Sequence, residues 1–185
     1  MLRENSKTVK DHYPEHNLVL VGFMGTGKST VGKILAKRMN RTFIDMDRKI
    51  EEREKTSIST IFAEHGEARF RGLESALALE LAVTTKNVIA CGGGIVLNEA
   101  NLIALGMAGV VICLSAEPAA ILERVSRNNK RPLLEGDDKF EKIKTLFEAR
   151  RELYAAINHQ VATDGHTLEE VSDLVETLYC NVAGK

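Results

Sequence analysis

The chain has 185 residues, 44% of them hydrophobic, and its formal net charge at pH 7 is −1. This length supports one good core but is too short for two ordinary domains and a linker, so we expect a single domain. The nearly balanced charge argues against a nucleic-acid-binding protein or a protein of anionic membrane surfaces, and it favours a small-molecule partner.

The first sixteen residues differ from the rest of the chain. Residues 1–16 are polar and charged and lack the apolar region of a signal peptide, so we expect a flexible extension before a domain over residues 17–183. No segment has the unbroken apolar length of a membrane span. The three cysteines, Cys91, Cys113 and Cys180, show no C-x-x-C spacing and are predicted to be reduced thiols. These features predict a cytoplasmic protein, which we expect to be a monomer.

A phosphate-binding motif follows the first predicted strand. Residues 17–21 are an apolar run typical of a buried parallel strand, and the next eight, Gly-Phe-Met-Gly-Thr-Gly-Lys-Ser at 22–29, fit G-x-x-x-x-G-K-[ST]. Apolar residues at helical spacing begin after Lys28. A glycine-rich turn that binds nothing is the alternative, but the four fixed positions with a strand before and a helix after favour a nucleotide triphosphate site.

The motif assigns roles to individual residues. Lys28 is expected to reach the β- and γ-phosphates and to act in catalysis, and the Ser29 hydroxyl to bind Mg²⁺. The residues expected to hold ATP in this loop are Gly25, Thr26, Gly27, Lys28, Ser29 and Thr30.

Two acids follow the second predicted strand, residues 41–44. Asp45 is the best candidate for holding Mg²⁺, through water, because neither of the next two predicted strands ends in a carboxylate. Asp47 is two residues further on and can face a substrate hydroxyl. The alternative for both acids is N-capping of the following helix. A GTPase is disfavoured, because the N-K-x-D tetrad is absent.

The remainder of the chain alternates strands with helices. Helical segments extend to about residue 84, and three strands are predicted later in the chain, over 87–91, 109–114 and 159–163. A helix is expected from near Pro118, and a charged segment with proline and glycine, residues 126–138, reads as a mobile lid. Further helices are predicted from an apolar stripe (Phe140, Ile143, Leu146, Phe147, Leu153 and Ile157) and from a capping box at Thr167 and Glu170. The pattern predicts a three-layer α/β P-loop fold, with a five-stranded parallel sheet and helices on both faces.

From Leu18 to about Tyr179 the chain resembles the shikimate kinase family, a member of the nucleoside-monophosphate-kinase-like P-loop group. The resemblance is carried, in order, by residues 22–30, Phe43–Asp47, Ser57-Ile58, Ile61-Phe62, residues 66–71, Glu74, Gly92–Gly94, residues 131–134, Arg150, Leu153 and Tyr154. It implies ATP-dependent phosphorylation of the 3-hydroxyl of shikimate, with Mg²⁺, in the pathway to chorismate and the aromatic amino acids.

The resemblance also implies a substrate-binding region over about residues 46–80, with further contacts from residues later in the chain. Shikimate carries a carboxylate and three hydroxyls, and the planar forks of Arg71 and Arg150 are suited to clamping the carboxylate. Backbone N–H groups of Gly92, Gly93 and Gly94 are expected to approach the substrate. Asp47 is expected to accept from ring hydroxyls and to take the proton of the attacked one.

Two further arginines receive roles from the resemblance. Arg131, in the lid, is expected to bind ATP and to offset charge on the transferring phosphoryl group. Arg124 is expected to stack on adenine, with the loop around Thr163 to Gly165 on the other face. Glu74 is expected to pair with Arg71 and set its rotamer.

Two other functions remain open from the sequence. One is a related P-loop kinase for another hydroxylated acid such as gluconate, against which Arg71, Gly92–Gly94 and Arg150 argue. The other is a nucleotide-sensing module without turnover, which the complete set of expected catalytic residues disfavours. The chain departs from the family pattern at Lys55, where glycine is usual, and at Cys113, where tryptophan is frequent.

Overall fold

A computed structural model describes residues 13–126 and 139–184. Its centre is a five-stranded parallel sheet with the order β2-β3-β1-β4-β5. The strands are β1 (Asn17–Val21), β2 (Thr42–Asp45), β3 (Asn87–Ala90), β4 (Gly109–Ser115) and β5 (Gln160–Ala162). β1 is the central strand, and its Leu18 lies opposite Val88 of β3 and Val110 of β4.

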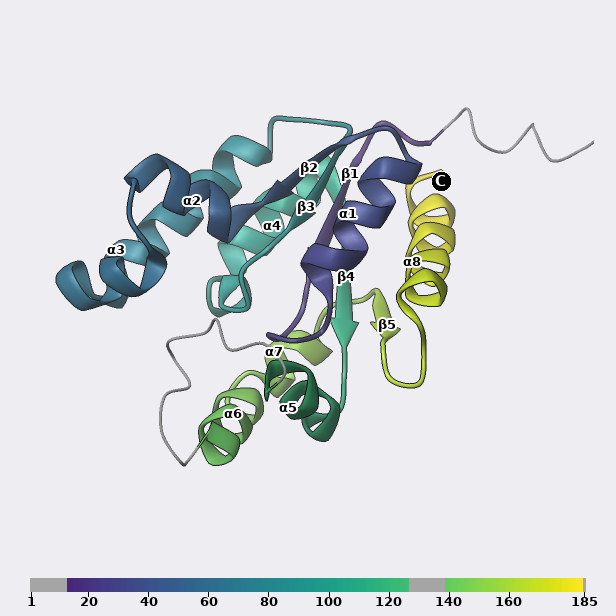
Figure 1. The fold of residues 1–185 in the computed structure, drawn as a ribbon. Helices are drawn as coiled ribbons and strands as arrows, with labels where there is room; N and C mark the ends of the chain where they lie inside the picture. The colour runs from purple at the N-terminus through teal and green to yellow at the C-terminus, as the bar shows by residue number, and fades with distance from the viewer. Residues whose placement is uncertain (1–12, 127–138, 185) are drawn as a thin grey trace, which may run out of the picture.

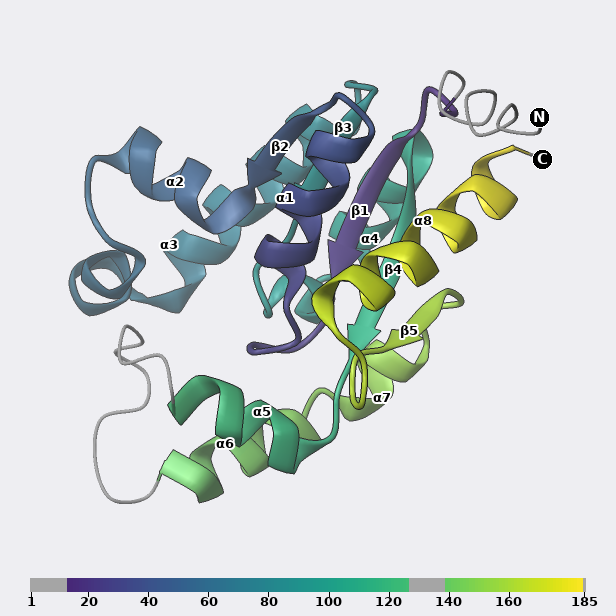
Figure 2. The ribbon, with the colours of Figure 1, turned by 45° about the vertical axis from the view of Figure 1, so that its right-hand side comes forward.

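Helices cover both faces of this sheet (Figure 1). α1 and α8 pack together on one face, and α4 packs on the other, against α3 and β4. The helices are α1 (Lys28–Arg38), α2 (Met46–Glu54), α3 (Ile58–Leu81), the short 3₁₀ helix η1 (Ile95–Leu97), α4 (Glu99–Ala108), α5 (Pro118–Ser126), α6 (Lys139–Glu148), α7 (Arg151–Ala155) and α8 (Leu168–Ala183). α5 and α6 lie together beyond the end of β4, as Figure 2 shows.

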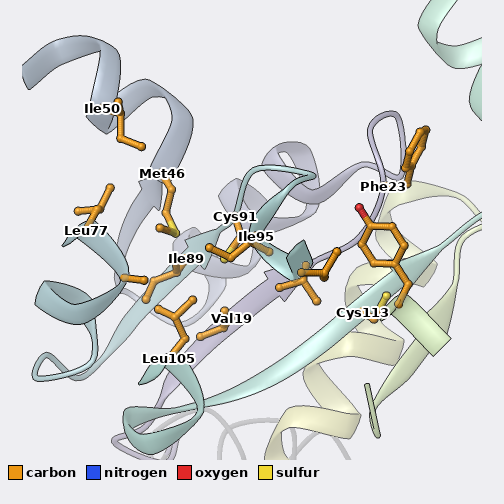
Figure 3. Packing of buried hydrophobic residues seen from close by; sticks show 14 of the residues in the cluster. Val19, Phe23, Met46, Ile50, Leu77, Ile89, Cys91, Ile95, Leu105 and Cys113 are labelled. Carbon is orange, nitrogen blue, oxygen red and sulfur yellow. The ribbon is translucent and has the colours of Figure 1, made fainter. Parts of the chain in front are cut away.

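The alternation of side chains along β1 divides the core into two parts. Leu18 and Leu20 belong to the cluster under α1 and α8, whereas Val19 and Val21 belong to the cluster on the opposite face. Successive side chains of a strand point to opposite faces of a sheet, so an apolar run of this kind suits a strand that is covered on both sides. Figure 3 shows the second cluster, with Val19 among side chains from α2, α3, α4 and β3.

The predicted fold class is confirmed, with one correction among the helices. The apolar stripe from Phe140 to Ile157 predicted one helix, but α6 and α7 are separate and Arg150 lies in the turn between them. Leu153, assigned to the buried stripe, is 41% exposed, and Tyr154 is buried instead. The turn changes which side of the segment faces the core, and no proline or glycine marks it. The capping box at Thr167 and Glu170 is present.

The remaining sequence features have simple structural counterparts. Cys91 and Cys113 are buried, Cys180 is half-buried, and all three are free thiols. Within the described residues, no helix is both long and apolar enough to cross a membrane. Residues 13–16, assigned to the extension, contact the domain: Lys86 N donates to Glu15 O at 2.8 Å, and Tyr179 Oη donates to Pro14 O at 2.9 Å.

The order of the strands positions the functional site. In a parallel sheet all strands end at the same edge, and ligands bind there, where the connections leave in opposite directions. β1 lies between β3 and β4, so the loops after β1, β2 and β3 meet at this edge.

Candidate active site

The phosphate loop after β1 has the backbone conformation that its glycines predict. Gly22, Gly25 and Gly27 have positive φ angles of 138°, 80° and 92°, which other residues rarely adopt. A Cβ atom on Gly22 would lie 2.2 Å from the carbonyl oxygen of Leu114 in β4. Gly27 is the N-cap of α1 and provides no side-chain hydrogen bond, and the first turn of the helix carries no acid. The positive end of the α1 dipole therefore faces the loop without a competing carboxylate in that turn.

Lys28 and Thr26 hold the loop in its curved shape. Lys28 Nζ donates to the carbonyl oxygens of Gly22, at 2.8 Å, and Phe23, at 2.9 Å. Thr26 Oγ1 also donates to Phe23 O, at 2.8 Å, and Thr26 is 2% exposed. The Thr26 side chain thus serves the loop itself, and the Thr26 N–H also donates to Phe23 O, at 3.4 Å. Thr30, in the first turn of α1, is exposed.

Ser29 and Asp45 form the pair that was expected to bind metal. Ser29 Oγ donates to Asp45 Oδ2 at 2.7 Å, although the two residues come from α1 and the end of β2. Asp45 also caps α2, because its Oδ1 accepts from Arg48 N at 3.3 Å. The capping alternative and the metal prediction are therefore compatible. One hydroxyl and one carboxylate fit Mg²⁺, which prefers oxygen ligands and retains several waters.

Asp47 lies over the first glycine of the Gly92–Gly94 loop. It is inside the first turn of α2, so the capping alternative does not hold for this residue. A Cβ atom on Gly92 would lie 2.4 Å from Asp47 Oδ1 and 3.1 Å from Glu74 Oε1. The loop after β3 can approach these two carboxylates only because position 92 has no side chain.

Arg71, from α3, lies against the third glycine. A Cβ atom on Gly94 would be 2.2 Å from Arg71 Nη1. The guanidinium is held by two carboxylates: Nη1 donates to Glu74 Oε2 at 2.8 Å and Nη2 to Glu67 Oε1 at 2.8 Å. Its side chain is 24% exposed, so Arg71 is not the solvated surface arginine that is usual on a helix.

Glu74 pairs with Arg71, as the sequence suggested, and the structure shows that it is buried. It is 1% exposed, and its Oε1 accepts no hydrogen bond among the described residues. Burial raises the pKa of Glu74 above its ordinary value, against the lowering effect of Arg71, and the nearby Asp47 raises it further. A buried carboxylate thus fixes Arg71 and adds negative charge beside Asp47.

Arg150 reaches the middle glycine from the turn before α7. Its Nη1 donates to Gly93 O at 3.3 Å, and Tyr154 Oη donates to the same oxygen. Arg71 and Arg150, the two arginines predicted to clamp a carboxylate, therefore approach the same glycine loop from α3 and from the α6–α7 turn. Sequence reasoning gave Tyr154 no role of its own, and its place beside Arg150 in the family motif was the available signal.

Arg124 lies next to the loop that was expected to bind adenine. Its Nη1 donates to Thr163 Oγ1 at 2.7 Å, and its Nη2 to Thr163 O at 3.2 Å and to Asp164 Oδ1 at 3.3 Å. These bonds use the edge of the guanidinium, whereas stacking uses its flat face. Arg131 and residues 127–138 of the expected lid lie outside the described residues.

Comparisons with known proteins identify the family of this chain. The family model described as shikimate kinase matches residues 24–179. A shikimate kinase of Caldanaerobacter subterraneus subsp. tengcongensis is 40% identical over 169 residues, covering 91% of this chain and 99% of the relative. The solved structure of shikimate kinase from Acinetobacter baumannii in complex with shikimate aligns with a TM-score of 0.83 and 31% identity, covering 98% of this chain and 99% of the other.

A gluconokinase from Sinorhizobium meliloti also aligns, with a TM-score of 0.62, and covers 94% of this chain and 95% of the other. At 16% identity, this likeness shows a shared fold alone. The chain belongs to the shikimate kinase family.

Proposed function

We propose that this member of the shikimate kinase family transfers the γ-phosphoryl group of ATP to the 3-hydroxyl of shikimate, giving shikimate 3-phosphate and ADP. The observation that carries the proposal is the Gly92–Gly94 loop, where Asp47, Arg71 and Arg150 meet beside the phosphate loop. A hydroxyl acceptor and a carboxylate clamp lie there next to the nucleotide site.

On the nucleotide side, the phosphate loop and the N-terminus of α1 hold the phosphates. Lys28 exchanges its two carbonyl partners for β- and γ-phosphate oxygens and offsets charge that develops during transfer. The Ser29 hydroxyl and, through water, the Asp45 carboxylate would hold Mg²⁺. When bound, Mg²⁺ would supply positive charge that offsets the negative charge of the ATP phosphates.

On the substrate side, Arg71 and Arg150 hold the carboxylate and thereby fix the orientation of the ring. Asp47 accepts a hydrogen bond from the 3-hydroxyl. The hydroxyl oxygen forms a bond to the γ-phosphorus while the bond to the β,γ-bridging oxygen breaks, and the proton passes to Asp47 as ADP leaves. Arg131 offsets charge on the transferring group, and the flat face of Arg124 stacks on adenine; both roles come from the family resemblance. We further propose a cytoplasmic monomer.

The direct experiment measures ADP release with Mg²⁺ and ATP, in the presence of shikimate, of gluconate or of neither. Release that depends on shikimate, with gluconate no better than the ATP-only background, is the expected result. Equal release without shikimate, or turnover of gluconate alone, would exclude the proposal.

A variant of Lys28 tests whether the measured activity depends on the phosphate loop of this protein. Lys28→Met should lower kcat by at least about two orders of magnitude, since one electrostatic contact in a site of this kind is worth ~3 kcal/mol. The matched control is Lys37→Met, an exposed lysine on the same helix, which should keep wild-type turnover. Turnover by Lys28→Met within a fewfold of wild type would remove Lys28 from the mechanism.

A further inference from the structure

Gly93, in the middle of the Gly92–Gly94 loop, lies next to the phosphate loop. A Cβ atom on Gly93 would lie 3.6 Å from Met24 N and 3.8 Å from Gly22 O. The two loops follow neighbouring strands, β1 and β3, and leave the sheet at the same edge. Any group that holds Gly93 therefore acts at the boundary between the nucleotide and substrate sites.

Tyr154 holds Gly93 by its carbonyl. The Tyr154 hydroxyl donates to Gly93 O, across 61 residues of sequence, and the tyrosine is 7% exposed. Burial raises the pKa of Tyr154 to about 12, so the hydroxyl remains a donor throughout the neutral range. Arg150 shares the same acceptor, but in the proposed function its guanidinium also holds the substrate carboxylate.

The carbonyl of Gly93 and the N–H of Gly94 belong to one planar peptide. In a trans peptide these two groups point in opposite directions, so a bond that fixes the carbonyl also fixes the N–H. Gly94 lies against the guanidinium of Arg71. The peptide held by Tyr154 is therefore next to both arginines of the clamp.

The ring of Tyr154 is anchored on the phosphate loop. It packs edge-to-face on Phe23, with ring centroids 6.3 Å apart and ring planes at 89°. The carbonyl of Phe23 is the one that accepts from Lys28 and Thr26. Phe23 also packs edge-to-face on Phe147, at 5.5 Å, so its ring is fixed from α6 as well. The hydroxyl of Tyr154 thus has a defined place relative to the phosphate loop.

We propose that Tyr154 is a positioning residue for substrate binding: its hydroxyl fixes the Gly93–Gly94 peptide so that the Gly94 N–H joins Arg71 and Arg150 around the shikimate carboxylate. The inference rests on the proposed function and adds a residue that does not touch the substrate. Loss of the hydroxyl should therefore change the affinity for shikimate and leave the rate of phosphoryl transfer unchanged. Lys28 and Asp47, which are proposed to act in transfer, are not partners in the bond between Tyr154 and Gly93.

The test is Tyr154→Phe, which keeps the ring on Phe23 and removes only the hydroxyl. The matched control is Tyr179→Phe, which removes a buried hydroxyl that donates to Pro14 O and His16 O, remote from the glycine loop. Shikimate affinity is measured by calorimetry, together with KM for both substrates, kcat and Tm.

For Tyr154→Phe we expect shikimate affinity to fall about three- to tenfold, as for the loss of one hydrogen bond, with kcat and KM for ATP within twofold of wild type. For Tyr179→Phe we expect a lower Tm and unchanged shikimate affinity. Unchanged affinity in Tyr154→Phe, or a parallel rise of both KM values, would overturn the positioning role. If the wild-type protein itself binds no shikimate, the proposed function fails. If the wild type binds shikimate and Tyr154→Phe binds it equally well, only the positioning role fails.

Discussion

Asp45 performs two tasks with its two carboxylate oxygens, and a substitution can separate them. Oδ1 caps α2 through Arg48 N, and Oδ2 accepts from Ser29. Asparagine caps helices as well as aspartate does but carries no charge. Asp45→Asn should therefore retain its Tm while the midpoint of the Mg²⁺ titration of activity rises ~10- to 100-fold, the usual effect of removing a group that supports a metal.

A capping residue elsewhere provides the control for Asp45. Ser57 caps α3, with Oγ accepting from Thr60 N at 3.1 Å, and Ser57→Ala should cost about 1 kcal/mol of stability with no effect on the metal titration. If Asp45→Asn titrated like the wild type, the metal role would belong to another residue.

Glu74 gives the site a pH-dependent stability. Its folded pKa is raised above the ordinary 4.5, so the unfolded chain loses this proton first as the pH rises. The stability that Glu74 contributes is therefore present below pH 4.5 and is lost as the pH rises through the folded pKa. Compared with Glu74→Gln, which does not titrate, the wild type should lose Tm as the pH rises above 4.5 and through the raised pKa of Glu74.

Thermal unfolding of both proteins across this pH range measures the difference directly. Glu67→Gln is the matched control. Glu67 also pairs with Arg71, but its side chain is 55% exposed, so this substitution should not reproduce the pH dependence that comes from burial. We also expect Glu74→Gln to bind shikimate more weakly, since a neutral amide holds Arg71 less firmly. A Tm difference that is constant with pH would show that burial of Glu74 does not govern its ionisation.

At the scale of elements, the loop after β3 lies among side chains from three helices: Asp47 of α2, Arg71 of α3 and Tyr154 of α7. Gly94→Ala would place a methyl group where the Arg71 guanidinium lies, 2.2 Å from Nη1. Displacing Arg71 should weaken shikimate binding by ~1.5–3 kcal/mol, roughly ten- to a hundredfold, the worth of a charge-assisted hydrogen bond. Binding of ATP should be nearly unchanged, because the clash is on the substrate side. Calorimetry with each ligand measures both effects.

Gly72 offers the same substitution without the clash. It is in α3, and a Cβ atom there would meet nothing within 4 Å. Gly72→Ala should keep shikimate affinity and gain about 0.5–1 kcal/mol of stability, because alanine loses less backbone entropy in a helix. Full shikimate affinity in Gly94→Ala would mean that Arg71 does not act from its observed position.

Local sequence signals predicted the elements better than the contacts between them. The phosphate loop, the strand before it and the capping box of α8 depend on neighbouring residues, and their sequence patterns are sufficient to locate them. The break before α7 could not be predicted, because residues 148–151 contain no proline or glycine. The bond from Tyr154 to Gly93 joins residues far apart in sequence, and no local pattern specifies such a contact.

At the scale of the whole molecule, the sheet order explains why two ligands meet. The phosphate loop follows β1, Asp45 ends β2 and the glycine loop follows β3, so a single sheet edge supplies the groups proposed to bind nucleotide, metal and substrate. α3 and the α6–α7 turn then bring Arg71 and Arg150 to the same edge. In the proposed function, this arrangement places one hydroxyl of the clamped carboxylic acid at Asp47, next to the phosphate loop.

The position of the transferred phosphate tests this account most directly. The reaction product from shikimate, ATP and Mg²⁺ can be analysed by proton–phosphorus correlation NMR, which identifies the ring carbon that carries the phosphate. We predict a single product in which phosphorus couples to the proton on carbon 3. A phosphate on another hydroxyl, or no phosphorylated shikimate at all, would contradict the account.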